Sequence, residues 1–243
     1  MTTTNDDRNQ IPPLGANSNK ETLFEVIEIF DSICGEVNGY DGIGQVSTFI
    51  RLATCNLKCR WCDTLCAQVP MNSQHFSLET LLTNVTSAHV TITGGEPLLQ
   101  QSAVVELVGM LCEQGHQVTI ETNGSIIPSA ELLALPCVLM MDFKLPSSQM
   151  MPMMSPAAFK VLRPEDWVKF VCADPFDFQH AILALESWDI GANHIAFSPC
   201  LGSEVDLGIA KELCVTMLEY LDSSAEKRRL HFSLQIHKLL GVR

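Results

Sequence analysis

The stretch Cys55-Asn56-Leu57-Lys58-Cys59-Arg60-Trp61-Cys62 carries three thiols, with three and then two residues between them. Thiolate sulfur is the ligand that selects iron-sulfur clusters and zinc. Three thiolates leave a four-iron cluster one ligand short, so one iron stays open to a substrate or a cofactor. The loop therefore predicts a 4Fe-4S cluster that takes part in chemistry.

Two other metal centres remain open for these thiols. A structural zinc site needs a fourth ligand from a second Cys or His pair at close spacing, and the sequence shows no such pair. Cys66, four residues after Cys62, could instead supply a fourth thiolate. Four thiolates would saturate the cluster and indicate an electron-transfer protein, although such a carrier does not need a fold of this size.

The composition indicates a globular protein that acts on small molecules. The chain has 243 residues, of which 47% are hydrophobic and 18% are charged, so we expect one domain with a sizeable core. Its 28 acidic and 15 basic residues give a net charge of -13, which repels nucleic-acid phosphate. The substrate should therefore be small rather than polymeric, with no direct nucleic-acid partner.

The sequence also bears on location and domain organisation. No apolar run reaches about 18 residues and the N-terminus is polar, so we expect neither a membrane span nor a signal peptide. In a cytoplasmic protein the ten cysteines should be metal ligands and small buried residues rather than disulfides. Residues 1–20 show no hydrophobic period and predict a mobile N-terminal extension, followed by a single domain over residues 21–243.

Strand patterns alternate with helix patterns along this domain. The predicted strands are Leu23–Ile29, Ser47–Leu52, His89–Thr93, Gln117–Ile120, Cys137–Phe143, Trp167–Val171, His194–Phe197 and His231–Gln235. The predicted helices are Leu78–Ser87 with Ser77 as its N-cap, Leu98–Glu113, Phe176–Trp188 and Asp206–Leu221. Almost every polar motif follows the C-terminal end of a strand, where parallel βα barrels gather their active sites. About six such strands are too few for a closed eight-fold barrel, so we predict an α/β fold with an incomplete, open (βα)6-type barrel.

The cysteine spacing resembles the signature of the radical S-adenosylmethionine (SAM) enzymes, in which the amino and carboxylate groups of SAM chelate the open iron. Five segments further resemble the 7-carboxy-7-deazaguanine synthase family of that superfamily. They are Gly35-Glu36, Phe49-Ile50-Arg51-Leu52, Cys55-Asn56-Leu57, Trp61-Cys62-Asp63-Thr64 and Thr93-Gly94-Gly95-Glu96-Pro97. The resemblance runs from about Ser32 to the last residue.

The resemblance implies a carbon-nitrogen lyase of the radical SAM kind. Such an enzyme converts 6-carboxy-5,6,7,8-tetrahydropterin to 7-carboxy-7-deazaguanine with loss of ammonia, for queuosine or another deazapurine pathway of tRNA modification. The reduced cluster would cleave SAM to a 5'-deoxyadenosyl radical, which takes hydrogen from the carbon bearing the carboxylate. The resemblance also implies Mg2+, a flavodoxin or ferredoxin-type reductant, and a homodimer.

The substrate side of the predicted site centres on Arg51, because a guanidinium in an apolar strand needs an anion. The anion is either an internal carboxylate or, as the resemblance implies, the carboxylate of the substrate. From the local sequence alone, Glu36 is a solvent-exposed turn residue. The resemblance instead implies that it lies where the family holds the pterin ring. The family usually has Gln at the position of Cys34, so only a backbone contact carries over there. The implied substrate-binding residues are Ile33, Cys34, Gly35, Glu36, Arg51, Thr93, His237 and, through its terminal carboxylate, Arg243.

The cofactor side has similar alternatives. Thr64 by spacing is a helix cap, whereas the resemblance makes it the Mg2+ ligand. The segment Asp142-Phe143-Lys144 is either a rim ion pair or a strip along SAM. The implied cluster ligands are Cys55, Cys59 and Cys62. The implied SAM contacts are Trp61, Cys62, Asp63, Gly95, Glu96, Glu121, Asp142, Phe143 and Lys144.

One further enzyme class shares the cluster loop and the Gly-Gly-Glu motif. A glycyl-radical-activating enzyme acts on a protein backbone, and it should lack Arg51 and His237 as a pair. Both residues are present here. The pair therefore favours the lyase.

Overall fold

The computed structural model describes residues 22–40, 42–69, 71, 73–201, 207–224 and 228–242. The predicted N-terminal extension lies outside the described residues. None of the helices described is both long enough and apolar enough to cross a lipid bilayer.

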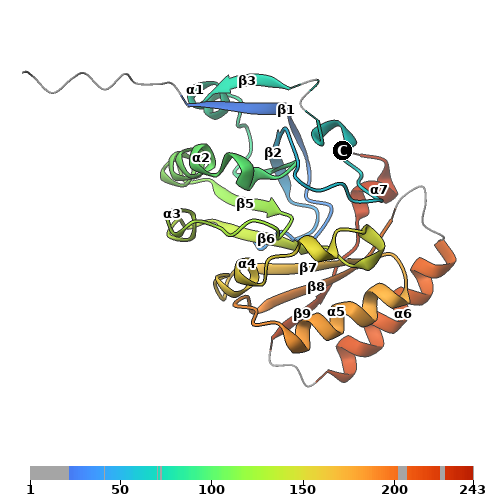
Figure 1. The fold of residues 1–243 in the computed structure, drawn as a ribbon. Coiled ribbons are helices and arrows are strands. Elements are labelled where there is room, and N and C mark those ends of the chain that lie inside the picture. Colours follow the sequence, from blue (N-terminus) through green and yellow to red (C-terminus); the bar gives the residue numbers. More distant parts are fainter. Residues whose placement is uncertain are drawn as a thin grey trace, which may run out of the picture.

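The described residues form one sheet of nine strands (Figure 1). In spatial order the strands are β3 (Gln74–Ser77), β1 (Leu23–Ile33), β2 (Val46–Leu52), β4 (His89–Gly94), β5 (Gln117–Thr122), β6 (Val138–Phe143), β7 (Trp167–Cys172), β8 (His194–Pro199) and β9 (Arg229–Phe232). Strands β2 and β4 to β9 pair in parallel, each with its neighbour in this order. Strand β1 pairs antiparallel with both β2 and β3. Since β3 and β9 stand at opposite ends of this order, the described sheet is open.

The predicted fold class is confirmed as an α/β protein with a mostly parallel, open sheet. The parallel part contains seven strands, β2 and β4 to β9, rather than about six. The sequence pattern missed β3, because its four residues carry no clear alternation and form a strand only by pairing with β1. The last predicted strand also shifts, since β9 ends at Phe232 and Gln235 directly precedes the helix Ile236–Leu240.

The helices lie outside the sheet. The longer ones are α1 (Leu78–Thr83), α2 (Gln101–Glu113), α5 (Pro175–Ser187) and α6 (Leu207–Ser223). The shorter ones are α3 (Ala130–Leu133), α4 (Pro156–Lys160), α7 (Ile236–Leu240) and the 3-10 turns η1 (Leu65–Ala67), η3 (Pro97–Gln100), η4 (Pro146–Ser148) and η5 (Met151–Met153). Ser77 caps α1 as predicted, because its side chain accepts a hydrogen bond from the amide of Thr80 at 3.2 Å. Figure 1 shows α5 and α6 packed side by side against the later strands.

The two faces of each parallel strand have different partners. On β5, Val118 and Ile120 are fully buried in the main hydrophobic core, whereas Thr119 and Glu121 line an interior cavity. Neighbouring residues of a strand point to opposite faces, so the apolar face packs under the helices and the polar face turns inward. This alternation gives the barrel a polar interior at its open end.

Candidate active site

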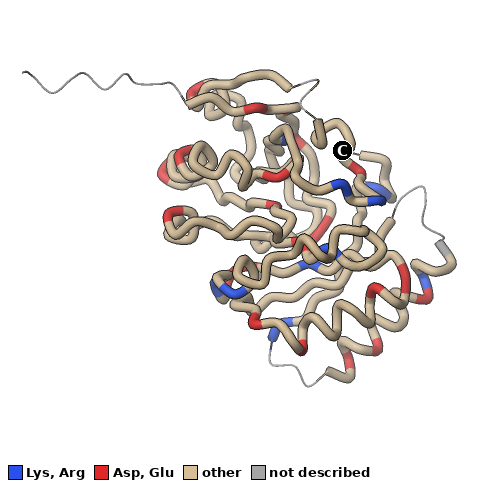
Figure 2. Tube along the Cα trace, in the orientation of Figure 1, with Lys and Arg blue, Asp and Glu red and all other residues tan. Residues whose placement is uncertain are grey.

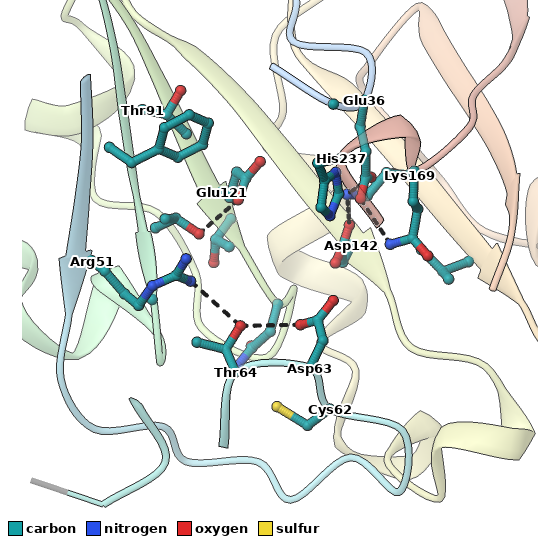
Figure 3. A pocket seen from close by; sticks show the side chains of 18 of the residues that line it. Glu36, Arg51, Cys62, Asp63, Thr64, Thr91, Glu121, Asp142, Lys169 and His237 are labelled. Carbon is teal, nitrogen blue, oxygen red and sulfur yellow. Dashed lines mark hydrogen bonds and ion pairs between the residues drawn. The ribbon is translucent and has the colours of Figure 1, made fainter. Parts of the chain in front are cut away.

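A cavity of about 440 Å³ opens at the carboxyl ends of the parallel strands (Figure 3). The predicted site residues that line it are Ile33, Cys34, Gly35, Glu36, Arg51, Cys55, Cys59, Trp61, Cys62, Asp63, Thr64, Thr93, Gly95, Glu121, Asp142, Lys144 and His237. Glu96 and Phe143 do not line it. Arg243 lies outside the described residues.

The cluster loop follows β2 and is fastened on two sides. Leu57 is buried, and its amide lies 3.4 Å from Cys55 Sγ. The amide of Arg60 donates to the carbonyl of Ser148 at 3.1 Å, which ties the loop to η4. The amide group of Asn123, after β5, lies 3.7 Å from Cys55 Sγ. The loop is therefore held by segments that are distant in sequence.

The donor set fits an iron-sulfur cluster. Burial raises the pKa of Cys59 to about 11 and also raises the pKa of Cys55, so these thiols keep their protons at neutral pH until a metal displaces them. Among the described residues, no three His, Cys, Asp or Glu side chains are grouped closely enough to hold one metal ion. A four-iron cluster is wider than a single ion. Three separated thiols on one cavity therefore suit a cluster better than mononuclear zinc.

Cys66 is separated from the other three thiols. It lies in η1, is exposed to solvent and does not line the cavity. This placement favours three protein thiols over four.

The glycines after β4 allow close backbone contact with the start of the cluster loop. Gly94 has a φ of +125°, and a Cβ on Gly95 would lie 1.9 Å from the carbonyl oxygen of Thr54. The amides of Gly95 and Glu96 donate to the carbonyls of Leu52 and Thr54, each at 2.9 Å. A side chain at position 95 would force these two segments apart.

Glu96 lies behind the cavity wall rather than on it. Its side chain is fully buried and accepts hydrogen bonds from the amide of Leu98 (2.9 Å), the hydroxyl of Thr122 (2.7 Å) and the amide of Asn123 (2.7 Å). The three hydrogen bonds lower the pKa of Glu96, but burial outweighs them and raises it above the usual value. The family resemblance implied that Glu96 contacts SAM. In the structure it joins the end of β4 to the end of β5.

Phe143 also points away from the cavity. Its side chain is 1% exposed and packs against Phe159, Phe170 and Trp188, with ring centroids 4.8 to 5.3 Å apart. Its neighbours Asp142 and Lys144 line the cavity and form an ion pair at 2.8 Å, as the rim interpretation expected. The strand alternation places Phe143 in the core and its two neighbours at the site.

Arg51 has an internal partner and still faces the cavity. Its Nε donates to Glu28 Oε1 at 2.9 Å, and Nη1 lies 3.4 Å from Thr64 Oγ1. Its guanidinium also stacks over the ring of Phe30, 5.3 Å from the centroid. In the described part of the chain no residue hydrogen-bonds to Nη2, so one edge of the fork remains for a ligand.

A charged cluster on the opposite wall contains Lys169, which the sequence analysis did not single out. Lys169 Nζ lies 2.5 Å from Glu36 Oε2 and 3.2 Å from Asp142 Oδ1 (Figure 3). Burial opposes its charge, but Asp142, Glu36 and Glu121 outweigh burial and raise its pKa well above the usual value. A signal was available, because Lys169 interrupts the apolar strand β7 just as Arg51 interrupts β2.

Helix α7 closes another side of the cavity. The amide of Ile236 donates to the carbonyl of Gly35 at 2.9 Å, and a Cβ on Gly35 would lie 2.1 Å from His237 Nδ1. Burial lowers the pKa of His237, which keeps this imidazole neutral at physiological pH. Gln235 Nε2 donates to Glu36 Oε1 at 2.8 Å. The sequence analysis missed Gln235, since nothing local links it to a residue 199 positions away.

Three further predicted residues, Thr93, Glu121 and Cys34, form hydrogen bonds at the cavity wall. Thr93 Oγ1 donates to Glu121 Oε2 at 2.6 Å, and burial raises the pKa of Glu121. Cys34 is 4% exposed, and its Sγ lies 3.5 Å from Nδ1 of the buried His89. Burial raises the pKa of Cys34, so its side chain faces the cavity as a neutral thiol.

Comparisons with known proteins bear first on the cluster segment and on the fold. A model described as a 4Fe-4S single cluster domain matches residues 40–142. The crystal structure of QueE from Escherichia coli has the same fold, with a TM-score of 0.65, 22% identity, and coverage of 87% of this chain and 93% of that chain.

Curated relatives match nearly the whole length. The 7-carboxy-7-deazaguanine synthase of Clostridium acetobutylicum is 33% identical over 224 residues, covering 89% of this chain and 96% of the relative. The enzyme of the same name from Methanospirillum hungatei is 34% identical over 239 residues, covering 95% and 92%. From its sequence identity and coverage, the chain belongs to the 7-carboxy-7-deazaguanine synthase family.

Proposed function

We propose that this protein is a radical SAM lyase that converts 6-carboxy-5,6,7,8-tetrahydropterin to 7-carboxy-7-deazaguanine with loss of ammonia, in queuosine or another deazapurine biosynthesis. The observation that carries the proposal is that Cys55, Cys59 and Cys62 share one cavity with the guanidinium of Arg51. The cavity thus combines a ligand set for a cluster with a cation suited to a carboxylate. The name shared by the relatives supports the same reaction.

The three thiols would hold a 4Fe-4S cluster that leaves one iron for SAM. When bound, this pair supplies a 5'-deoxyadenosyl radical after one-electron reduction. The chain itself would hold SAM through residues between the cluster loop and β6, namely Trp61, Cys62, Asp63, Gly95, Glu121, Asp142 and Lys144. Glu96 and Phe143 would act indirectly, by fixing the wall that carries these contacts.

The substrate would lie between Arg51 and the charged cluster on the opposite wall. The free edge of the Arg51 fork would grip the carboxylate, which fixes the reacting carbon beside it. Glu36 would accept hydrogen bonds from the N–H groups of the pterin ring, and Ile33, Cys34 and Gly35 would contribute backbone contacts. Thr93, His237 and the terminal carboxylate of Arg243 complete the proposed substrate set.

A magnesium ion would bind beside Thr64. Mg2+ keeps several waters and binds few protein oxygens together with oxygens of the substrate. The Thr64 hydroxyl lies 3.0 Å from Asp63 Oδ1, so a second oxygen is close by. The residues present therefore fit an ion bound mainly by water and substrate.

The electron donor would be a small acidic protein of the flavodoxin or ferredoxin type. Figure 2 shows acidic residues spread over α2, α5 and α6 and rather few basic residues. Lys58 and Arg60 flank Cys59, are exposed, and form no ion pair within the described ranges. They give the cluster loop a local positive charge that suits an acidic donor. In line with the family resemblance, we further propose a cytoplasmic homodimer.

Mass detection of the product tests the proposal. The anaerobically reconstituted protein is incubated with the tetrahydropterin acid, SAM, Mg2+ and a reductant, and 7-carboxy-7-deazaguanine is expected. Cys59→Ala is the matched control and should yield none. Formation of 5'-deoxyadenosine without any deazaguanine would contradict the proposed substrate.

A further inference from the structure

Lys169 stands at the centre of a chain of charges across the cavity. It lies in the middle of β7, and its side chain is 7% exposed. Its ammonium lies 2.5 Å from Glu36, which comes from the segment between β1 and β2, and 3.2 Å from Asp142, near the end of β6. These two carboxylates come from segments that are not neighbours in the sheet. Lys169 is the direct ionic link between them in the described structure.

Each carboxylate is held from its far side as well. Gln235 Nε2 donates to Glu36 Oε1 at 2.8 Å, and Lys144 lies 2.8 Å from Asp142 Oδ2. Within the described residues, Asp142 Oδ1 is buried and forms no hydrogen bond of good geometry, although Lys169 is within ion-pair distance. Both carboxylates therefore keep acceptor capacity for a ligand while Lys169 fixes their separation.

Removal of the Lys169 charge would leave the carboxylates poorly compensated. Glu121 lines the same cavity and, with Asp142 and Glu36, favours the charged form of Lys169 and raises its pKa. Like charges at such short range repel strongly in a partly desolvated site. Lys144 pairs with Asp142, and within the described residues it forms no ion pair with Glu36, so it does not replace Lys169 there. We expect Glu36 to move away from Asp142 once Lys169 is lost.

We propose that Lys169 is a positioning residue that couples the binding of the pterin acid to the binding of SAM. The inference rests on the proposed function, in which Glu36 contacts the substrate and Asp142 contacts SAM. When the pterin acid fixes the position of Glu36, the ammonium of Lys169 is fixed as well, and through it Asp142. SAM bound at Asp142 would act on Glu36 in the same way. Coupling of this kind is reciprocal, so substrate should tighten SAM binding by the same factor by which SAM tightens substrate binding.

Equilibrium dialysis of SAM measures this coupling without turnover. The cluster-loaded protein is kept oxidised, so SAM is not consumed, and the Kd of SAM is determined with and without the pterin acid. We expect the substrate to tighten SAM binding about tenfold in the wild type, within the usual range for coupled sites. In Lys169→Met the ratio should fall to about one, and Lys169→Arg should restore part of it because the charge is kept.

Two further variants separate positioning from a general structural effect. Lys160→Met removes an exposed lysine that pairs with Asp189 on the surface, and its ratio should equal that of the wild type. Glu36→Gln removes the charge from the other side of the same link and leaves Lys169 paired with Asp142, so it should also lower the coupling. This variant tests the inference even if Lys169→Met does not fold.

Each outcome decides between the two proposals. A wild type without coupling, or a folded Lys169→Met and Glu36→Gln that keep the wild-type ratio, would overturn the inference. If the wild type forms 7-carboxy-7-deazaguanine in that case, only the role of Lys169 is wrong. If the wild type forms no such product, the proposed function itself fails.

Discussion

Lys238 Nζ lies 2.7 Å from Asp63 Oδ2, so helix α7 is joined to the loop that carries the three thiols. The same ammonium donates to Gln235 Oε1 at 3.0 Å, and Gln235 in turn donates to Glu36. Burial opposes the charge on Asp63, but Lys238 outweighs it and lowers the pKa of Asp63 to about 2. The end of the described chain thus connects the proposed cofactor side with the proposed substrate side.

Replacement of Lys238 by Met should loosen α7. The ion pair is partly exposed, so overall stability should change by less than about 1 kcal/mol, whereas hydrogen exchange over residues 236–242 should become faster. Mass spectrometry of the exchanged protein measures this, with Lys211→Met on α6 as the control. Unchanged exchange over 236–242 would show that other contacts hold the helix.

The stabilising effect of this ion pair should depend on pH. Because the pKa of Asp63 is lower in the folded protein than its usual 3.8, its contribution is present above that value and is lost as the pH falls toward about 2. The difference in unfolding free energy between wild type and Lys238→Met should therefore shrink over this interval. Denaturant unfolding at a series of pH values checks the sign.

Loss of single cysteines should distinguish three thiol ligands from four. Cys59→Ala should remove most of the bound iron after anaerobic reconstitution, because a cavity ligand is lost. Cys66→Ala should keep the iron content and the visible absorption of the wild type, since Cys66 is exposed and away from the cavity. Loss of the cluster in Cys66→Ala would favour the four-thiolate interpretation.

Arg51→Ala should weaken substrate use more than SAM cleavage. A charge-assisted contact of the guanidinium fork with a carboxylate corresponds to about a 10- to 100-fold rise in KM for the pterin acid. Arg51→Lys keeps the charge but loses the fork, and it should recover only part of the affinity. Steady-state kinetics of product and of 5'-deoxyadenosine are measured together. A parallel fall of both would mean that Arg51 does not anchor the acid.

Glu96→Gln should destabilise the fold rather than change one binding constant. The amide keeps the shape of the side chain but turns an NH2 group toward a donor, so one buried hydrogen bond is lost at a cost of about 1–3 kcal/mol. Glu113→Gln, at an exposed position on α2, is the control. Urea unfolding measures the difference, and equal stability of the two variants would contradict the structural role of Glu96.

Charge reversal at Lys58 and Arg60 should slow electron delivery by a protein donor. The double variant Lys58→Glu with Arg60→Glu should react about tenfold more slowly with a flavodoxin or ferredoxin at low salt, and the gap should narrow as salt increases. Reduction by dithionite should be unaffected. Lys160→Glu with Lys211→Glu carries the same change in net charge elsewhere and serves as the control. Equal slowing in both double variants would point to net charge alone.

The sequence by itself determined the features that depend on residues close together in the chain. The spacing of Cys55, Cys59 and Cys62 defines a three-thiol loop in any fold that accommodates it, and strand alternation with helix caps predicted most of the elements. The position of Arg51 in an apolar strand correctly indicated a partly buried cation that needs an anion. Most of the predicted site residues line one cavity, and the roles proposed for them stay predictions.

Only the tertiary structure decided which distant groups meet. Lys169 pairs with Glu36, 133 positions away, and with Asp142 on the neighbouring strand. Both contacts depend on strand order and register, which no local pattern encodes. The same holds for Glu96, whose motif predicts a ligand contact but whose neighbours bury it. Local spacing fixes what a loop of a few residues can bind, because the chain has little freedom over that length. The walls around the loop depend on the packing of the whole sheet, which the sequence specifies only through its folded state.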